Sequence, residues 1–111
     1  MSRRDELLLQ DIHRACDKIL RFTSGVEREQ FLADEKTYDA VLRNLEIIGE
    51  AAKHVSEEAR TRFPPLEWRK ISAFRDIVVH EYFGIDENIL WDIVTNKVPA
   101  LLQQLKEGSV P

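Results

Sequence analysis

Apolar residues spaced alternately by three and four dominate the middle of this sequence. They are Tyr38, Val41, Leu45, Ile48, Ala52 and Val55. The spacing has the 3.6-residue period of an α-helix, so these side chains share one helix face. Asp34 is a suitable N-cap, and the pattern predicts a long helix over residues 35–62. Gly49 costs this helix about 1 kcal/mol relative to alanine, which indicates that another helix approaches closely there.

The same period predicts a helix at the start of the chain. Its inward stripe is Leu8, Ile12, Ala15, Ile19 and Phe22. Ser2 is expected to cap this helix, and residues 23–25 to end it. Ser24 and Glu27 then suit a capping box for a short second helix that ends near Ala33.

The second half of the chain predicts two more helices. The prolines at 64 and 65 should end the long helix, because proline cannot continue one, and Pro65 can open a fourth helix over residues 66–82. Gly84 should end it.

Asp86 is placed to cap a fifth helix. Its inward stripe is Ile89, Leu90, Ile93 and Val94. Pro99 should kink or break this helix near Lys97, leaving residues 100–105 as a last turn or two.

No segment alternates long enough to form a strand, so the fold class is all-α. We expect residues 1–111 to form a single domain, an antiparallel bundle of four main helices plus a short additional helix. The lone Cys16 suits a reducing compartment, and no apolar run reaches the ~20 residues of a membrane span. The first residues do not resemble a signal peptide, and we expect a cytoplasmic protein without membrane contact.

The net charge of −4 argues against non-specific coating of nucleic acid, which needs many cations. The charge is uneven, however. Residues 60–75 carry five basic side chains against one acidic side chain, Glu67, or +4. The basic ones are Arg60, Arg62, Arg69, Lys70 and Arg75. This segment could hold a polyanion, or it could be a set of solvated charges.

The stretch RDIVVHEY, residues 75–82, places polar groups around an apolar helix. Asp76 and His80 are one turn apart on one face, where the carboxylate could orient the imidazole, and Arg75 shares another face with Tyr82. Each also has an ordinary structural interpretation: a histidine near a helix C-terminus favours the helix dipole, arginine is usually solvated, and tyrosine packs in cores.

Other chemistries have less support in the sequence. His13, His54 and His80 lie on three predicted helices without metal-ligand spacing, Cys16 has no base nearby in sequence, and no glycine-rich phosphate loop occurs. We therefore expect no metal and no cofactor. Arginine beside histidine is instead what metal-free RNA cleavage requires: the imidazole takes the 2′-OH proton and the guanidinium stabilises the crowded phosphate. A symmetric dimer would supply two of each.

The pattern R-x4-H-x-Y formed by Arg75, His80 and Tyr82 resembles that of the HepT-like toxins of the HEPN superfamily. The flanks are similar too. Residues 44–51 (NLEIIGEA) resemble the core of the family's long helix, residues 65–71 the segment before the motif, and residues 82–93 the segment after it. The similarity covers roughly residues 7–105.

The resemblance implies an all-helical, metal-independent endoribonuclease that dimerises to form its cleft. It implies a toxin partnered by a minimal nucleotidyltransferase antitoxin, which adds AMP to the motif tyrosine. By position, Arg75 and His80 become catalytic and Tyr82 the AMPylated residue. Asp76 departs from the family, which often has asparagine there, and this acid would add negative charge near an RNA phosphate.

Glu46 and Glu50 flank Gly49 on the long helix, and one of them could pair with Arg75 and aim it; both could equally be solvated. Arg43 and Asn44 could face the cleft. Two other classes of function stay open. One is a non-catalytic module that binds a nucleotide or recruits a nucleotidyltransferase, and the other is a purely structural helical bundle.

Overall fold

The computed structural model describes residues 1–63, 66–79 and 84–108, and all regular structure in these ranges is helical. In chain order the elements are α1 (Arg3–Thr23), α2 (Arg28–Ala33), α3 (Glu35–His54), α4 (Glu57–Arg60), α5 (Trp68–Ser72), α6 (Phe74–Val79), α7 (Glu87–Asp92), the π-helical turn η2 (Ile93–Lys97) and α8 (Val98–Gly108). The all-α class is confirmed. None of the described helices combines the length and apolar character needed to cross a bilayer.

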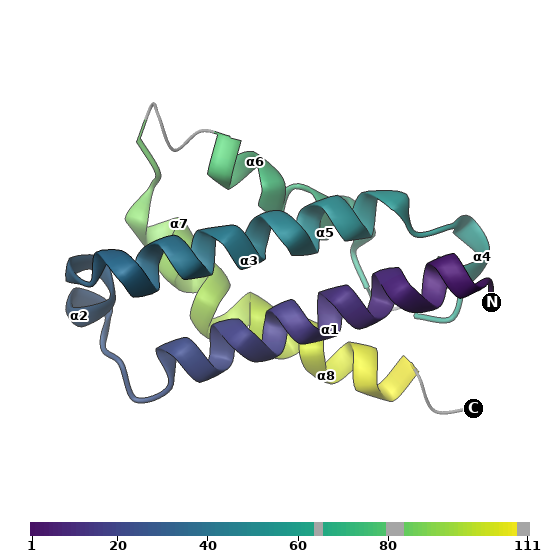
Figure 1. The fold of residues 1–111 in the computed structure, drawn as a ribbon, viewed down its shortest axis with the longest axis horizontal. Helices are drawn as coiled ribbons and strands as arrows, with labels where there is room; N and C mark the ends of the chain where they lie inside the picture. Colours follow the sequence, from purple (N-terminus) through teal and green to yellow (C-terminus); the bar gives the residue numbers. More distant parts are fainter. Residues whose placement is uncertain (64–65, 80–83, 109–111) are drawn as a thin grey trace.

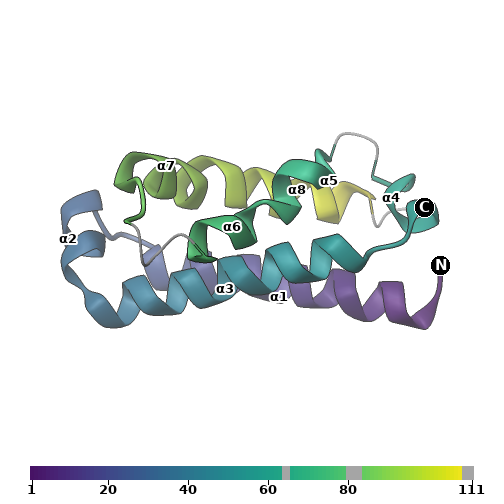
Figure 2. The same cartoon turned by 90° about the horizontal axis from the view of Figure 1, so that it is seen from above.

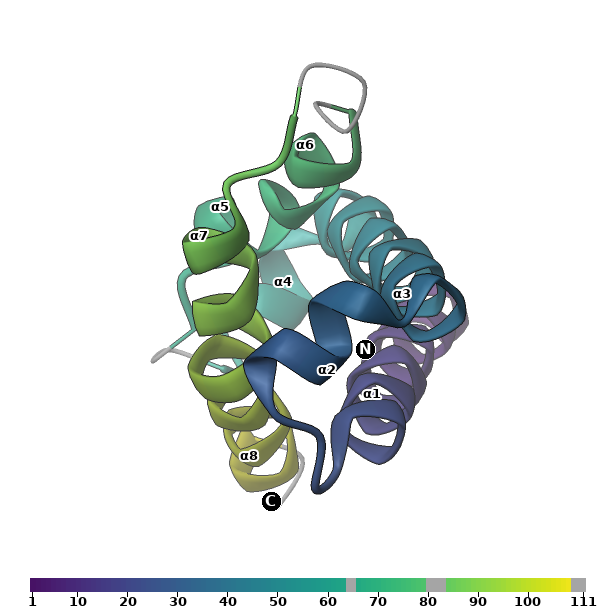
Figure 3. The ribbon, with the colours of Figure 1, turned by 90° about the vertical axis from the view of Figure 1, so that its left-hand side faces the viewer.

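The two longest helices, α1 and α3, lie side by side and run in opposite directions, with α2 closing one end (Figure 1). Helix α8 packs along α1, and the N-terminus and the last turn of α8 lie at the other end of the molecule (Figure 1). Seen along the long axis, α7 and α8 form the side of the molecule opposite α1 and α3, while α6 stands over α3, apart from α8 (Figure 3).

The core lies between α1, α3 and the α7–α8 segment. Its fully buried large side chains are Ile12, Ile19, Phe31, Val41, Leu45, Ile48, Leu90, Val94 and Val98. Most of them belong to the stripes that the periodicity predicts. The prediction that Phe22 and Ile89 face inward is wrong. Phe22 is 38% exposed at the end of α1, and Ile89 is 55% exposed in the first turn of α7.

The long helix ends at His54, eight residues before the predicted end at Arg62. Val55 is extended, and Ser56 is the N-cap of the separate helix α4. The cause lies on α1: Ser56 donates its N–H to Asp5 Oδ1 at 3.0 Å and its hydroxyl to Asp5 Oδ2 at 2.6 Å. These charge-assisted hydrogen bonds are roughly twice as strong as neutral ones, and they use the Ser56 N–H that a continued helix would direct at the Ala52 carbonyl.

Arg60 also stabilises the connection between α3 and α4, here called the α1–α4 corner because Asp5 of α1 binds it too. Its Nε donates to the Val55 carbonyl at 3.1 Å and its Nη2 to the Ala52 carbonyl at 3.0 Å, which satisfies acceptors that the end of α3 leaves open. Its guanidinium also lies 5.6 Å from the ring centroid of Trp68. Arg60 is therefore a structural cation, unavailable to a polyanion.

The start of α2 is also shifted from the prediction. Ser24 is the C-cap of α1, and the chain turns through Gly25 at φ +72°. The N-cap of α2 is Glu27, whose N–H donates to Gln30 Oε1 at 3.0 Å. The reciprocal capping interaction thus joins Glu27 and Gln30, three residues later than the predicted pair of Ser24 and Glu27.

The predicted helix over residues 66–82 is divided. Helix α5 begins at Trp68 and ends at Ser72, Ala73 forms a turn, and α6 begins at Phe74. Because this helix is broken, the predicted bundle of four main helices is not confirmed. Pro65 and the end of the predicted helix at Tyr82 lie outside the described residues.

Pro99 acts close to where the sequence predicts. The chain loosens into the π-helical turn η2 over residues 93–97, where Val98 N–H bonds to the carbonyl of Ile93. Pro99 then lies in the first turn of α8, where its missing N–H costs little. Helix α8 extends to Gly108, three residues beyond the predicted end.

Hydrogen bonds from Ser56 lower the pKa of Asp5 below its ordinary value of 3.8. The unfolded chain then binds the proton more readily, so the stabilisation by Asp5 is complete above pH 3.8 and is lost as the pH falls below it. We expect Asp5→Asn to lower the melting temperature by several degrees at pH 7, and the difference from the wild type to shrink towards pH 2. Thermal unfolding followed by circular dichroism measures both values.

Asp11→Asn is the matched control, because Asp11 is exposed on the same helix. Equal effects of the two substitutions at pH 7 would contradict a special role of the α1–α4 corner.

Candidate functional site

Arg75 lies in the first turn of α6, the element that carries the start of the R-x4-H-x-Y pattern. Helix α6 packs on α3 and only weakly on its neighbour α5 (Figures 1 and 2). Its outer side is open, and Val79 at its end is 59% exposed. The position of Arg75 is therefore set almost entirely by the contact between α6 and α3.

That contact is centred on Gly49, where the sequence predicts a close approach of another helix. A Cβ atom at position 49 would lie 2.6 Å from the backbone nitrogen of Arg75, 2.7 Å from its Cβ and 2.9 Å from the carbonyl oxygen of Ser72. Two of these three neighbours are backbone atoms, one at the end of α5 and one in α6, which cannot move without moving those helices. The predicted close approach is confirmed, and the approaching segment is the one that carries Arg75.

Glu50, the next residue of α3, faces the arginine side chain. Its Oε2 lies 3.5 Å from Arg75 Nε, and the two side chains are 42% and 41% exposed. Oε2 itself is shielded from solvent and accepts no hydrogen bond within the described part of the chain. Among the described residues, Arg75 is the cation that forms an ion pair with Glu50. The contact uses Nε, so the two terminal nitrogens of Arg75 are not needed for it.

Glu46 lies one turn earlier on α3 and is occupied differently. Its Oε1 is 3.5 Å from Nη1 of Arg43, and both side chains are solvated. Asn44 is buried, and its amide donates to the Ala40 carbonyl at 2.8 Å, so it supports α3. Of the acids flanking Gly49, Glu50 is thus the one that meets Arg75.

Asp76 is exposed, its backbone N–H donates to the Ala73 carbonyl at 2.9 Å, and its carboxylate forms no hydrogen bond or ion pair with any described residue. His80 and Tyr82 lie outside the described residues. The predicted pairing of Asp76 with His80, and the predicted position of Tyr82, therefore stay predictions.

A groove of about 420 Å³ between α1 and α3 borders Glu50. Its charged lining consists of Asp11, Arg43, Glu46 and Glu50. Three acids against one base repel a phosphate, so this groove does not suit a polyanion.

Residues 60–75 contain five basic side chains, but not all five are available to bind a ligand. Arg60 is committed to the end of α3, and Lys70 Nζ pairs with Glu67 Oε2 at 3.0 Å. Arg69 is exposed and has no ion-pair partner among the described residues. Because of these pairings, the segment does not present five cations to one ligand.

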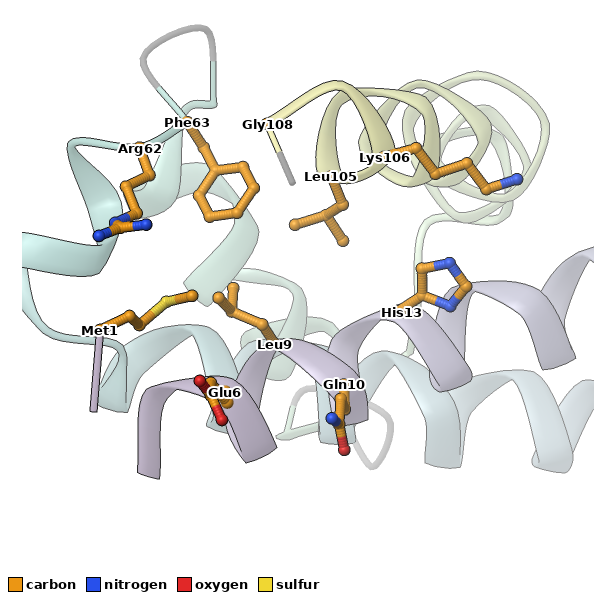
Figure 4. Close-up of a pocket in the computed structure, with 10 residues that line it drawn as sticks. All are labelled: Met1, Glu6, Leu9, Gln10, His13, Arg62, Phe63, Leu105, Lys106 and Gly108. Carbon is orange, nitrogen blue, oxygen red and sulfur yellow. The ribbon is translucent and has the colours of Figure 1, made fainter. Parts of the chain in front are cut away.

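A second cavity, of about 560 Å³, lies between α1, α8 and the chain after α4 (Figure 4). Phe63, Leu9 and Leu105 line its interior, and His13 stands near one end of it (Figure 4). It is larger than the groove beside Glu50, but Arg75 is not among the described residues that line it. We therefore place the candidate site at Arg75.

Cys16 is no candidate nucleophile. It is fully buried in the core, and burial raises the pKa of its thiol to about 12. The thiol stays protonated at neutral pH, and a protonated thiol is a poor nucleophile.

We expect Gly49→Ala to destabilise the protein. Alanine favours an isolated helix by about 1 kcal/mol over glycine, but overpacking against α6 costs typically about 1–3 kcal/mol. The expected net result is a loss of stability together with displacement of Arg75. Urea unfolding measures the change, with Asp39→Ala as the control at an exposed position of α3. A gain in stability from Gly49→Ala would contradict the close contact.

Comparison with known proteins gives a consistent result. A family profile described as "Ribonuclease HepT-like" matches residues 12–108. The "Probable ribonuclease HepT" of Thermococcus cleftensis is 41% identical over 101 residues, which cover 91% of this chain and 92% of that protein. A Methanocaldococcus jannaschii protein named "Putative RNase" is 41% identical over 99 residues (89% and 82%). Another from that organism, also so named, is 36% identical over 107 residues (96% and 98%). No solved structure matched the chain.

Proposed function

Because this chain belongs to the HepT-like ribonuclease family, we propose that it is a metal-independent endoribonuclease in which Arg75 and His80 act together on RNA. The observation that carries the proposal is the seating of Arg75. Its backbone is held against Gly49 and its Nε faces Glu50, so its terminal nitrogens can meet a phosphate. Guanidinium groups bind phosphate oxygens through paired N–H donors.

In the proposed reaction His80 removes the proton from a ribose 2′-OH. The freed oxygen attacks the adjacent phosphorus, and the bond to the 5′ oxygen breaks, giving a cyclic phosphate and a 5′-hydroxyl end. Arg75 stabilises the additional negative charge on the phosphate oxygens in the transition state. The leaving oxygen takes up a proton from a second imidazole.

A homodimer would supply the second imidazole. Each chain has one motif histidine, so two copies related by a twofold axis bring two histidines and two arginines to one cleft. The bare outer side of α6 supports this pairing. Val79 is 59% exposed there, so the end of this helix leaves room for a second copy of the chain.

We further propose that the protein is the toxin of a toxin–antitoxin pair, silenced by AMPylation of Tyr82 by a minimal nucleotidyltransferase. Family membership and the tyrosine two residues after His80 support this step. The Tyr82 hydroxyl attacks the α-phosphorus of ATP, and pyrophosphate leaves. The attached phosphate would compete with RNA for Arg75, and the nucleoside would occupy space in the cleft.

Purified protein should cleave single-stranded RNA in the presence of EDTA. We expect Arg75→Ala to reduce the rate about 100-fold or more, since it removes the transition-state donor, and His80→Ala to abolish cleavage. Arg69→Ala removes an equal charge from the neighbouring helix α5 and should change the rate less than about threefold. Product analysis on gels, with mapping of cyclic phosphate ends, measures both the rate and the chemistry.

Absence of cleavage, combined with tight binding of a nucleotide or a nucleotidyltransferase, would overturn the nuclease proposal. The alternative function, a non-catalytic recruiting module, would then replace it. A change in stability alone for Arg75→Ala would point to a structural bundle.

Tyr82→Phe should keep the nuclease activity and resist silencing, because it removes only the hydroxyl that accepts AMP. Mass spectrometry after incubation with the cognate transferase and ATP should show no mass increase for the variant, and RNA cleavage should continue. Tyr38→Phe is the control, since the chain has only two tyrosines, and it should still be modified and silenced. Silencing of Tyr82→Phe would contradict the assignment of the modified residue.

A further inference from the structure

The seat of Arg75 is built from two neighbouring residues of α3 with different tasks. Gly49 brings the α6 backbone to α3, where any larger residue would meet the Arg75 backbone nitrogen at 2.6 Å. Glu50 then faces the side chain at 3.5 Å. The contact at Gly49 sets the position of the Arg75 backbone, and the contact with Glu50 sets the position of its guanidinium.

We propose that Glu50 is a positioning residue: it holds the Arg75 guanidinium through Nε so that both terminal nitrogens point to one RNA phosphodiester. This inference rests on the proposed ribonuclease function. A guanidinium is planar and its five N–H donors are fixed relative to one another, so a carboxylate that attracts its Nε side favours orientations in which the terminal N–H groups stay free for another anion. A solvated arginine would sample many rotamers, and ordering it at each turnover would raise the barrier.

The environment of Glu50 distinguishes positioning from chance proximity. Its Oε2 is shielded from solvent and accepts no hydrogen bond in the described ranges, although the side chain as a whole is 42% exposed, and Arg75 is the cation that lies beside this oxygen. A shielded carboxylate oxygen without a compensating charge is unfavourable, which gives the pair a reason to stay together. Glu46, one turn away, is exposed to a similar degree, 40%, and pairs with Arg43 instead.

Glutamate near an RNA phosphate also has an opposing effect, because its charge repels the substrate. If repulsion were its main effect, Glu50→Gln would bind RNA more tightly and cleave at least as fast. If Glu50 positions Arg75, the same substitution slows the chemical step while substrate binding is unchanged or improved. The two roles therefore predict opposite directions for kcat.

The experiment compares Glu50→Gln with Glu46→Gln in steady-state cleavage of a single-stranded RNA. Each substitution removes one negative charge from α3 at similar exposure, 42% and 40%. We expect Glu50→Gln to lower kcat about 10- to 100-fold with KM unchanged or lower, and Glu46→Gln to leave kcat within about twofold. Glu50→Asp keeps the charge on a shorter stem and should restore part of the lost kcat. Circular dichroism and unfolding curves establish that each variant is folded.

A double-substitution cycle with Arg75→Lys tests whether Glu50 acts through Arg75. Lysine lacks the planar guanidinium with its Nε and two terminal nitrogens. In the Arg75→Lys variant, Glu50→Gln should therefore change kcat less than about twofold. An equal drop in both backgrounds would overturn the proposal, as would a Glu50→Gln variant that matches the wild type.

Nuclear magnetic resonance gives a readout independent of activity. The Nε–Hε signal of Arg75 should shift in Glu50→Gln and stay in place in Glu46→Gln. If the wild type fails to cleave RNA, the ribonuclease function fails, and the catalytic role of this seat with it. A different outcome would show that only the positioning role is wrong. In that outcome the wild type cleaves RNA, Arg75→Ala does not, and Glu50→Gln changes neither the Nε–Hε signal nor kcat.

Discussion

The close approach of α6 to Gly49 is the contact on which the candidate site depends. Helix α6 packs on α3 and hardly elsewhere, so a single helix determines where Arg75 starts. A glycine in the middle of a 20-residue helix is intrinsically unfavourable, and here it is retained at the point where the backbone of a second segment needs the room. The same contact places Glu50, the next residue, within reach of the guanidinium. Two consecutive residues of α3, Gly49 and Glu50, therefore contribute both to the packing of α6 and to the candidate site.

Much of the fold could be predicted because its helices carry their information locally. The stripes of α1 and α3 identify most of the buried core, Asp34 caps α3 and Asp86 caps α7 as expected, and Gly49 correctly indicates a close approach. Periodicity fails where a distant residue decides. The end of α3 depends on Asp5, 51 positions before Ser56, and no local pattern contains that hydrogen bond. The turn at Ala73 likewise could not be predicted from local sequence, since it lies where the chain packs against Gly49 of α3.

The candidate site was predictable in its residue types but only partly in its arrangement. The sequence singles out Arg75 and offers Glu46 and Glu50 as equal partners, because both lie next to Gly49 on the helix surface. Only the packing of α6 distinguishes them, by setting Arg75 beside Glu50 while Glu46 turns to Arg43. The basic count over residues 60–75 was misleading for a similar reason. A count of charges does not reveal that Arg60 serves backbone carbonyls.

The ion pair between Arg75 and Glu50 also bears on how RNA would arrive. Seen from beyond a Debye length, about 8 Å at physiological ionic strength, the pair is a dipole with no net charge, and the whole chain carries −4. Such a surface gives a polyanion no long-range attraction, so encounter proceeds by ordinary diffusion and recognition begins only at contact. Few counterions would be released on binding, and affinity for RNA would depend on salt far less steeply than in proteins that bind nucleic acid through a basic face.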